Sequence, residues 1–417
     1  MATLKQPIQF RAWMIWGLGA LFFLIEYFVR ISPSVISNEL MSAFSVKAFS
    51  IGGLSAFFYY AYAGMQIPAG LLVDRFGSYK LLVLATFCCA VGTLVFASSG
   101  SIMMAYLSRF IVGFGSAFAF VCALKLISIW FPDNKFSLLA GITQALGMVG
   151  AAIGDAPLSI IFHHFGWRKT MLGIALLFLL LCIAIIFIVK ERKSSLTSRS
   201  ETSLKPALSH VLSNPQAWLN GLFIGLLFAP TAAFAEQWGV PFLSNQNHLN
   251  PTVAAFDIGL IFIGLAIGCP VFGWLTEKLQ TRTKIMRFSA IASLILLFII
   301  IYISHYASLP NSILAILLFA YGLANSGIVP SYALAAKINP PQLTGLAIGF
   351  TNMASILIGA IFIPIIGFLL DYFWQGKIYH AIPLYSNTDY MISLSILPLS
   401  LLLAFMVSFM IKDHASA

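Results

Sequence analysis

Three apolar segments of this sequence contain charged side chains, whose types suit the handling of protons or anions. Glu26 and Arg30 lie in the first segment, Arg109 in a later one and Asp155 in the one after that. A charge near the centre of a bilayer costs on the order of 3 kcal/mol, so each needs a partner or a water-filled cavity. Because residues four apart share a helix face, Glu26 and Arg30 can pair with each other, or with Arg109 and Asp155 across helices.

Two interpretations of these four charges stay open. A rise of about 1.5 Å per residue puts Glu26, Arg109 and Asp155 at a comparable depth in the outer half of the membrane. A buried carboxylate there could take up a proton from outside and release it inside, which would couple a proton gradient to uptake. Alternatively, the four charges neutralise one another permanently and fix the packing of the helices. We favour the first interpretation.

Other polar side chains within apolar segments extend the candidate binding site. Lys125 lies near the cytoplasmic interface, so its ammonium can either reach the headgroups or bind a substrate carboxylate. Glu236 and Asp257 fall near the outer ends of their segments, where an interfacial position is expected. Neutral amides and phenols can hydrogen-bond a ligand or bond one helix to another. Those considered are Tyr59, Tyr60, Gln144, Asn325 and Asn352.

Membrane-spanning helices must position these side chains. Of the 417 residues, 60% are hydrophobic and 9% are charged, which excludes a soluble domain. A helix needs about 20 apolar residues to cross the hydrocarbon, and the alternation of a membrane β-barrel is missing from the sequence. The twelve predicted spans are residues 13–35, 51–72, 81–98, 102–131, 138–162, 170–189, 217–238, 253–275, 288–305, 313–335, 343–370 and 391–411.

Lysines and arginines set the predicted orientation. With both termini in the cytoplasm, most of the 23 basic residues fall on the cytoplasmic side, which is the positive-inside bias of a fixed topology. The net charge of +10 therefore indicates contact with anionic lipid and argues against a nucleic-acid partner. The first segment carries Glu26 and Arg30, so it does not have the features of a cleavable signal peptide.

The chain divides into two halves of similar length. Its middle is polar, charged and rich in Ser and Thr, which suits a cytoplasmic linker. We expect an N-terminal six-helix bundle at residues 1–190, the linker at 191–215 and a C-terminal six-helix bundle at 216–417. A charged turn recurs in both halves. In the first half it comprises Gly70, Asp74, Arg75, Gly77 and Lys80, and its weaker copy comprises Gly273, Glu277 and Lys278.

The repeated turn resembles the loop signature of the major facilitator superfamily, and Arg109 with Gly113 and Gly115 resembles a second motif of that family. The resemblance implies an all-α integral membrane protein with twelve transmembrane helices in two pseudo-repeated bundles, and a substrate site between them. It also implies that the residues of the charged turns form a cytoplasmic gate. The first helix usually lines the cavity in this family, so Glu26 is preferred to Asp155 as the proton carrier.

Further local similarity concerns the substrate. Residues 66–70, 123–127, 238–243 and 352–354, with Asp371, resemble bacterial relatives of the lysosomal dipeptide transporter, and less closely organic-anion symporters of the superfamily. This resemblance implies a small zwitterion or anion, such as a short peptide, an amino acid or an organic acid. The glycine-rich motif of the fifth span lacks the Gly-Pro pair that exporters carry, which argues against an exporter.

We therefore expect a secondary active transporter that imports such a solute with protons, by alternating access, in a bacterial inner membrane. Export of amphiphilic compounds, uniport, and a sensor that binds without transport stay open. The sequence contains no nucleophile–base motif, zinc motif or phosphate-binding loop, so we expect no enzyme activity, no cofactor and no metal. The expected partners are the small-molecule substrate, protons and the lipid bilayer, and the expected state is a monomer.

Overall fold

The structure is a computed structural model that describes residues 10–189, 204–246, 249–279, 281–303, 309–340, 343–379 and 382–413. Its first eight helices are α1 (Phe10–Val35), α2 (Ser37–Phe44), α3 (Ala48–Phe76), α4 (Ser78–Ser98), α5 (Ile102–Ser116), α6 (Ala119–Trp130), α7 (Asp133–Phe165) and α8 (Trp167–Ile188).

The second part of the chain is also helical, apart from a hairpin of two short strands. Its helices are α9 (Leu204–Ser213), α10 (Pro215–Pro230), the π-helical η1 (Thr231–Trp238), α11 (Gly239–Gln246), α12 (Pro251–Leu279), α13 (Arg282–Phe298), the π-helical η2 (Ile299–Ile303), α15 (Asn311–Asn325), α16 (Ile328–Lys337), α17 (Thr344–Phe373), α18 (Asn387–Leu394) and α19 (Ile396–Val407). The hairpin consists of β1 (Ile378–Tyr379) and β2 (Ile382–Pro383), which pair antiparallel.

These helices confirm the predicted all-α membrane fold. Ten helices are long and apolar enough to cross a membrane, and two bent helix pairs bring the number to as many as 12. Several predicted spans consist of more than one element, for example α5 with α6, and α15 with α16. The seventh span extends from Pro215 to Asn245, well beyond its predicted end at Trp238, because η1 and α11 continue α10.

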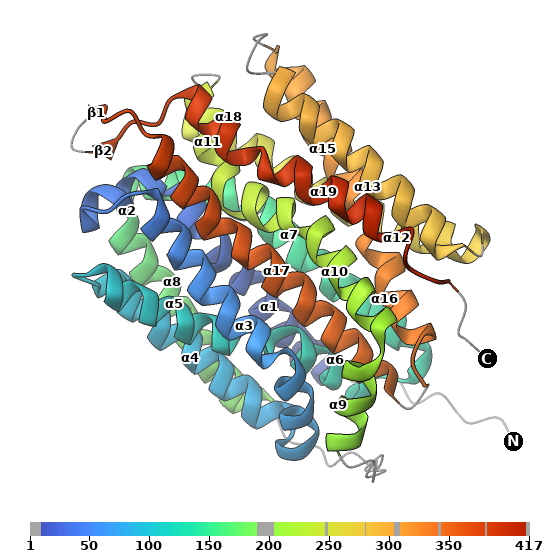
Figure 1. The fold of residues 1–417 in the computed structure, drawn as a ribbon. Coiled ribbons are helices and arrows are strands. Elements are labelled where there is room, and N and C mark those ends of the chain that lie inside the picture. The colour runs from blue at the N-terminus through green and yellow to red at the C-terminus, as the bar shows by residue number, and fades with distance from the viewer. Residues whose placement is uncertain are drawn as a thin grey trace, which may run out of the picture.

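The end of α19 lies at the same end of the bundle as α9 and α16, whereas α2, α18 and the hairpin lie at the opposite end (Figure 1). We call the first the predicted cytoplasmic end and the second the predicted outer end. Residues 190–203, most of the predicted linker, lie outside the described residues. Helix α9 occupies most of what remains of the linker and packs on α10 and α17.

At two of the prolines inside helices, a side chain from a neighbouring helix bonds the carbonyl that the proline leaves without its backbone donor. A proline inside a helix leaves the carbonyl four residues earlier without its usual donor. Pro33 of α1 frees the carbonyl of Val29, which accepts a hydrogen bond from Arg109 Nη1 at 2.6 Å. Pro230 at the end of α10 frees the carbonyl of Leu226, which accepts from Ser400 Oγ at 3.2 Å. The Val29 carbonyl also accepts from Ser32 Oγ at 2.9 Å, so neither carbonyl is left without a donor in hydrocarbon.

The two halves meet along two helix pairs, α3 with α17 and α7 with α12. Glycines allow the backbones to approach closely there. A Cβ at Gly52 would lie 2.9 Å from the Ile363 carbonyl oxygen, and one at Gly367 would lie 2.6 Å from that of Ala48. A Cβ at Gly259 would lie 2.7 Å from the Ala152 carbonyl oxygen. These contacts hold the halves together near the predicted outer end.

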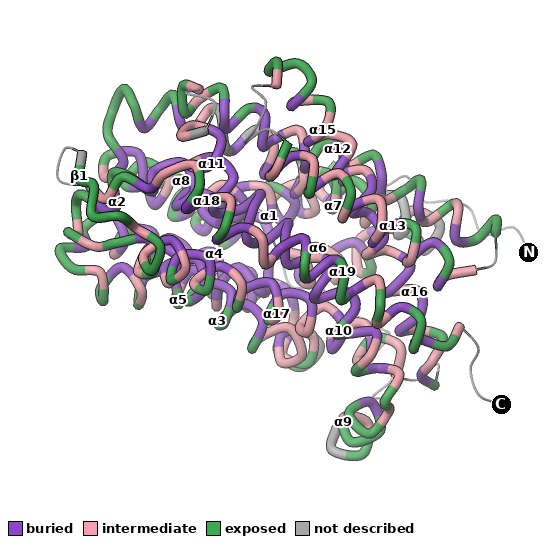
Figure 2. The backbone as a smooth tube through the Cα atoms, turned by 45° about the horizontal axis from the view of Figure 1, so that its top comes forward, coloured by how far each residue is buried: buried purple, intermediate pink, exposed green. Residues whose placement is uncertain are grey.

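The distribution of buried residues agrees with this packing of the two halves. Figure 2 shows buried backbone through the middle of the bundle and exposed residues along its outer faces. The outward residues of α8 are large and apolar, including Leu176, Leu180 and Phe187. In a membrane such side chains face the acyl chains, which explains why the surface of this bundle is hydrophobic.

The glycine contacts predict opposite effects for two Gly→Ala substitutions. A Cβ at Gly113 would lie 2.1 Å from the carbonyl oxygen of Phe58, whereas one at Gly173 meets no described atom within 4 Å. We expect Gly113→Ala to destabilise the protein by about 1–3 kcal/mol because α5 must move away from α3. Gly173→Ala should leave stability unchanged or raise it, because alanine favours a helix by up to about 1 kcal/mol over glycine. Thermal unfolding in detergent measures both, and equal melting temperatures would contradict the expectation.

Candidate functional site

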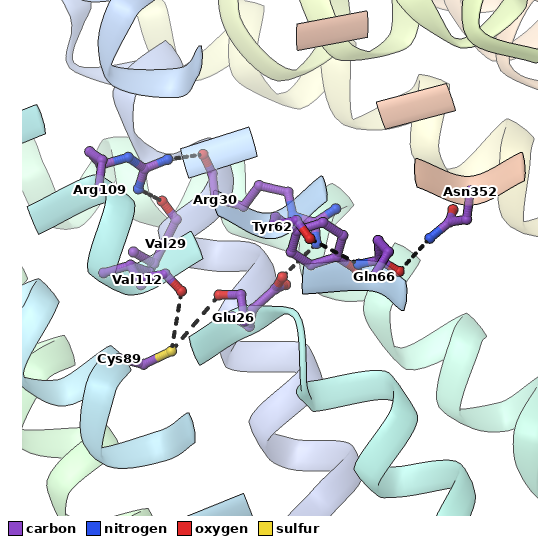
Figure 3. Close-up of polar contacts among 10 residues, drawn as sticks. Glu26, Val29, Arg30, Tyr62, Gln66, Cys89, Arg109, Val112 and Asn352 are labelled. Atoms are coloured by element: carbon purple, nitrogen blue, oxygen red, sulfur yellow. Dashed lines mark hydrogen bonds and ion pairs between the residues drawn. The ribbon is translucent and has the colours of Figure 1, made fainter. Parts of the chain in front are cut away.

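A buried ion pair lies at the centre of the candidate site. Arg30 Nη2 donates to Glu26 Oε1 at 2.5 Å, one helical turn apart on α1 (Figure 3). The exposed fractions are 5% for Arg30 and 0% for Glu26, so the pair is shielded from water. The pairing follows from the spacing of four residues. Glu26 Oε2 and Arg30 Nε have no hydrogen-bond partner among the described residues, so both groups retain unused bonding capacity.

Aromatic rings from α1 and α3 surround the guanidinium of Arg30. Its Cζ lies 4.2 Å from the ring centroid of Tyr27 and 4.8 Å from that of Tyr62, with Phe58 and Tyr59 at 5.6 and 6.0 Å. Ring faces attract a cation, most strongly where water is excluded. The Tyr59 hydroxyl is buried and has no partner among the described residues. The rings therefore stabilise a charged arginine while leaving a phenol free to bind.

The side chain of Arg109 bonds backbone carbonyls, although its charge suggested a pairing with a buried carboxylate. Its Nη1 and Nη2 donate to the carbonyls of Val29 and Arg30 at 2.6 and 2.9 Å (Figure 3). Its Nε donates to the Leu54 carbonyl at 3.4 Å. Each of these bonds ends on a backbone carbonyl. Arg109 thus fixes the kinked part of α1 that carries Arg30, and it positions the ion pair.

Glu236 is a buried carboxylate whose importance sequence reasoning missed. It was expected at the membrane interface, but it is 3% exposed in η1, and the helix continues beyond it through α11. The interfacial expectation for Glu236 was therefore wrong. Its Oε2 has no partner in the described part of the chain, and Arg30 and Glu26 act on it electrostatically. The available signal was an acidic residue after the proline of an apolar span.

A chain of amides links the halves on the cytoplasmic side of the ion pair. Asn352 of α17 donates from Nδ2 to Gln66 Oε1 of α3 at 2.8 Å (Figure 3). The same Asn352 accepts a hydrogen bond from the Tyr332 hydroxyl of α16 at 2.8 Å. These groups are partly buried, and such neutral donors and acceptors can bind a ligand when the bond between the halves opens.

Asp371 connects the two halves at the predicted outer end. Its carboxylate accepts from the backbone N–H groups of Ala48 and Phe49 at 3.1 and 3.0 Å, which begin α3. The Tyr385 hydroxyl donates to the same carboxylate at 2.5 Å. The unpaired N–H groups and the dipole of a helix N-terminus favour a negative charge. We call this contact between Asp371, Tyr385 and the start of α3 the outer latch.

The remaining predicted binding residues are dispersed. Asn325 is fully buried, donates to the Leu227 carbonyl at 3.0 Å and accepts from Thr231 Oγ1 at 3.1 Å, so it bonds helix to helix. Tyr60 is 39% exposed on α3, away from Arg30. Lys125 on α6 and Gln144 on α7 are partly buried. Asp155 lies on α7, but its side chain is outside the described residues.

The residues predicted to form the cytoplasmic gate lie near the turns that follow α3 and α12. Gly77 ends α3 with a φ of +85°, a conformation that favours glycine. Most of the charged gate side chains are exposed at these turns, and the side chain of Asp74 is outside the described residues. The exposed members are Arg75, Lys80, Glu277 and Lys278, and Gly70 and Gly273 lie on the preceding helices. Their role as a gate stays a prediction.

Comparison with known proteins agrees with this architecture. The profile of the Major Facilitator Superfamily matches residues 15–364 and 238–414. The uncharacterized transporter YybO of Bacillus subtilis is 25% identical over 405 residues, which cover 88% of this chain and 89% of YybO. The D-galactonate transporter of Escherichia coli is 23% identical, over 84% of this chain and 86% of its own. A crystal structure of a bacterial homologue of the human lysosomal transporter Spinster has a TM-score of 0.81 at 15% identity, covering 98% of this chain and 99% of that one.

This chain belongs to the major facilitator superfamily, because the family profile matches most of its length. It is therefore a multi-pass membrane transporter and not an enzyme, as the sequence predicted. Among the described residues, no group of three His, Cys, Asp or Glu side chains could hold a metal ion.

The carbonyl bonds of Arg109 predict that lysine cannot replace it. A lysine ammonium lacks the planar fork that reaches two carbonyls at once. We expect Arg109→Lys to lower the stability by about 1–3 kcal/mol, because lysine cannot keep the three hydrogen bonds to the carbonyls of Val29, Arg30 and Leu54. Thermal unfolding in detergent measures this, with Arg168→Lys as the control. Arg168 also bonds two carbonyls, those of Ala97 and Ser99, but it is partly exposed, so water can replace it. Equal losses in both variants would contradict the role of Arg109.

The outer latch predicts that Asp371→Asn opens the predicted outer end. Asparagine keeps one acceptor oxygen but loses the charge that the start of α3 attracts. Spin labels at Ser42 and Tyr372 should show a larger population of long distances in this variant. Asp389→Asn is the matched control, because the Asp389 carboxylate accepts from the Ser386 N–H at 2.7 Å within one half. Unchanged distances in Asp371→Asn would refute the latch.

Proposed function

We propose that this protein imports a small organic anion together with protons, by alternating the access of the Arg30 site between the two sides of the membrane. The observation that carries this proposal is the buried guanidinium of Arg30, paired with Glu26 among aromatic rings at the contact between the halves. A carboxylate is the natural ligand of such a group, since guanidinium and carboxylate form charge-assisted hydrogen bonds.

Charge balance explains why a proton should accompany the anion. Glu26 already occupies the guanidinium of Arg30, so a second carboxylate there would leave one of the two carboxylate charges without a direct partner in a dry site. Such a charge is costly, and removing one partner of a buried pair typically costs several kcal/mol. A proton on Glu26 removes this cost and frees Arg30 for the substrate carboxylate. Proton and anion therefore enter the site together.

The relatives support the substrate class. The D-galactonate transporter, which matches this chain over most of its length, is named for a sugar acid that carries a carboxylate. Zwitterions such as amino acids and short peptides share that group, so they remain within the proposed class. The ring faces of Tyr27 and Tyr62 and the amides of Gln66 and Asn352 can contact the uncharged part of such a solute.

The membrane and the orientation are proposed from the sequence. The bias of basic residues supports an orientation with both termini in the cytoplasm of a bacterial cell, in the inner membrane. We propose that the protein works as a monomer, because both six-helix bundles that enclose the site come from one chain.

Transport into proteoliposomes tests the proposal. An inward pH gradient should drive accumulation of an organic acid such as D-galactonate, with dipeptides and amino acids assayed in parallel. Glu26→Gln should lose the accumulation, because a permanently neutral side chain cannot carry the proton. Glu39→Gln, which alters an exposed carboxylate on α2, should retain it. Absence of gradient-driven accumulation of every solute class in the wild type would refute proton-coupled import.

A further inference from the structure

Glu236 lies where the second half of the protein approaches Arg30. It belongs to η1, which packs against α1 and α17, and its side chain is almost completely buried. The Oε2 atom has no hydrogen-bond partner among the described residues, although an ionised carboxylate in such a place needs one. The positive charge that reaches it belongs to Arg30. Glu236 therefore presents a free carboxylate oxygen to the site from the opposite half.

The buried charges of this cluster balance only when both halves are counted. Among the described side chains, the first half contributes the cations Arg30 and Arg109 and the anion Glu26. When Glu236 is ionised, it supplies the second negative charge from the other half. Because charges buried in a low-dielectric interior attract strongly, the first half attracts Glu236 when the predicted outer end is closed, as it is in this structure.

The backbone around Glu236 departs from a regular helix. Pro230 ends α10, and the following eight residues, Thr231–Trp238, are π-helical. π-Helical turns are rare and occur frequently at functional sites. The wider turn changes the direction in which side chains point, and Trp238 is fixed by its bond from Nε1 to the Ile363 carbonyl at 3.0 Å. The position of Glu236 is thus set by the fold.

We propose that Glu236 is an internal counter-ion that occupies the field of Arg30 until the transported anion replaces it. The inference rests on the proposed function and adds a residue to its site. The anion and ionised Glu236 cannot both remain beside Arg30 in the closed site, because two carboxylates would then share one free cation. When Glu236 is ionised, closure around the anion therefore requires a proton on Glu26 or Glu236.

Other titratable groups near η1 come from the helices packed against it. On α1 they are Glu26, Tyr27 and Arg30. Helices α10 and α11 contain none. Those on α12 and α17 are Asp257, Cys269, Glu277, Lys278, Asp371 and Tyr372. Helices α3 and α2 also bond η1, through Ser55 and Ser37 to Gln237, and they carry Tyr59 and Tyr62, beside Arg30, and Glu39.

Binding of D-galactonate to purified protein at pH 6 and pH 8 tests this role. The wild type should bind more weakly at pH 8, because the required proton is scarcer. Glu236→Gln should bind at least about fivefold more tightly than the wild type at pH 8, within the usual range of coupling between sites, and should depend less on pH. Glu236→Asp keeps the charge and should resemble the wild type, and it also serves if Glu236→Gln does not fold.

Asp257→Asn is the matched control. Asp257 is a carboxylate of the same half, 2% exposed, with an Oδ2 that has no partner in the described structure, but it pairs with Asn311. This variant should bind like the wild type at both pH values. Equal affinities and equal pH dependence in wild type and Glu236→Gln would overturn the proposal, and so would the same change in Asp257→Asn.

A second measurement needs no substrate and separates this inference from the proposed function. The rings of Phe49 and Phe368 lie 6.4 Å apart at the predicted outer end, so cysteines there, in a background without native cysteines, should cross-link. Glu236→Gln should lower the cross-linked fraction, whereas Asp257→Asn should not. Reduced cross-linking without anion binding would refute the anion substrate but support the counter-ion. Unchanged cross-linking and binding would refute the counter-ion even if transport is confirmed.

Discussion

Arg109 bonds the backbone of α1 at the turn that Pro33 interrupts. Pro33 removes the backbone donor of the Val29 carbonyl, which accepts from Ser32 Oγ of α1 and from Arg109 Nη1 of α5 instead, where hydrocarbon offers no water. The guanidinium bonds Val29 and Arg30 together, so the kinked helix has one defined shape. The orientation of Arg30, the ion pair with Glu26 and the aromatic rings around it all depend on that shape. Arg109 therefore holds the backbone of α1 in place, and the side chain of Arg30 takes part in the site.

The contact between the halves differs along the bundle. Near the predicted outer end, backbones touch at Gly52 and Gly367, and Asp371 caps the start of α3. Toward the predicted cytoplasmic end, a Cβ at Gly345 or Gly349 meets no described atom within 4 Å. The contacts between the halves at the predicted outer end are thus of three kinds: polar bonds, close backbone contacts at glycines and the apolar contact of Phe49 with Phe368.

Charge is distributed between the halves in a way that suits coupling. The first half holds the buried arginines Arg30 and Arg109, and the second half offers a carboxylate in η1 and the amide of Asn352 in α17. A site divided in this manner can register which ligand is present, because the attraction between the halves changes with the charge between them. Neither half could do this alone, since each carries part of the balance.

The sequence by itself determined the membrane class, the spans and the spacing of Glu26 and Arg30, because hydrophobic length and helical periodicity are local properties. It also indicated the family through the charged turn and Arg109. Only the tertiary structure decided that Arg109 bonds carbonyls, that Asn325 bonds helices and that Glu236 is buried in η1, which packs against α1. Those outcomes depend on which helices become neighbours and where an irregular helix ends. The seventh span extends past Trp238 because η1 and α11 pack between α1 and α12, and no local pattern reports such packing.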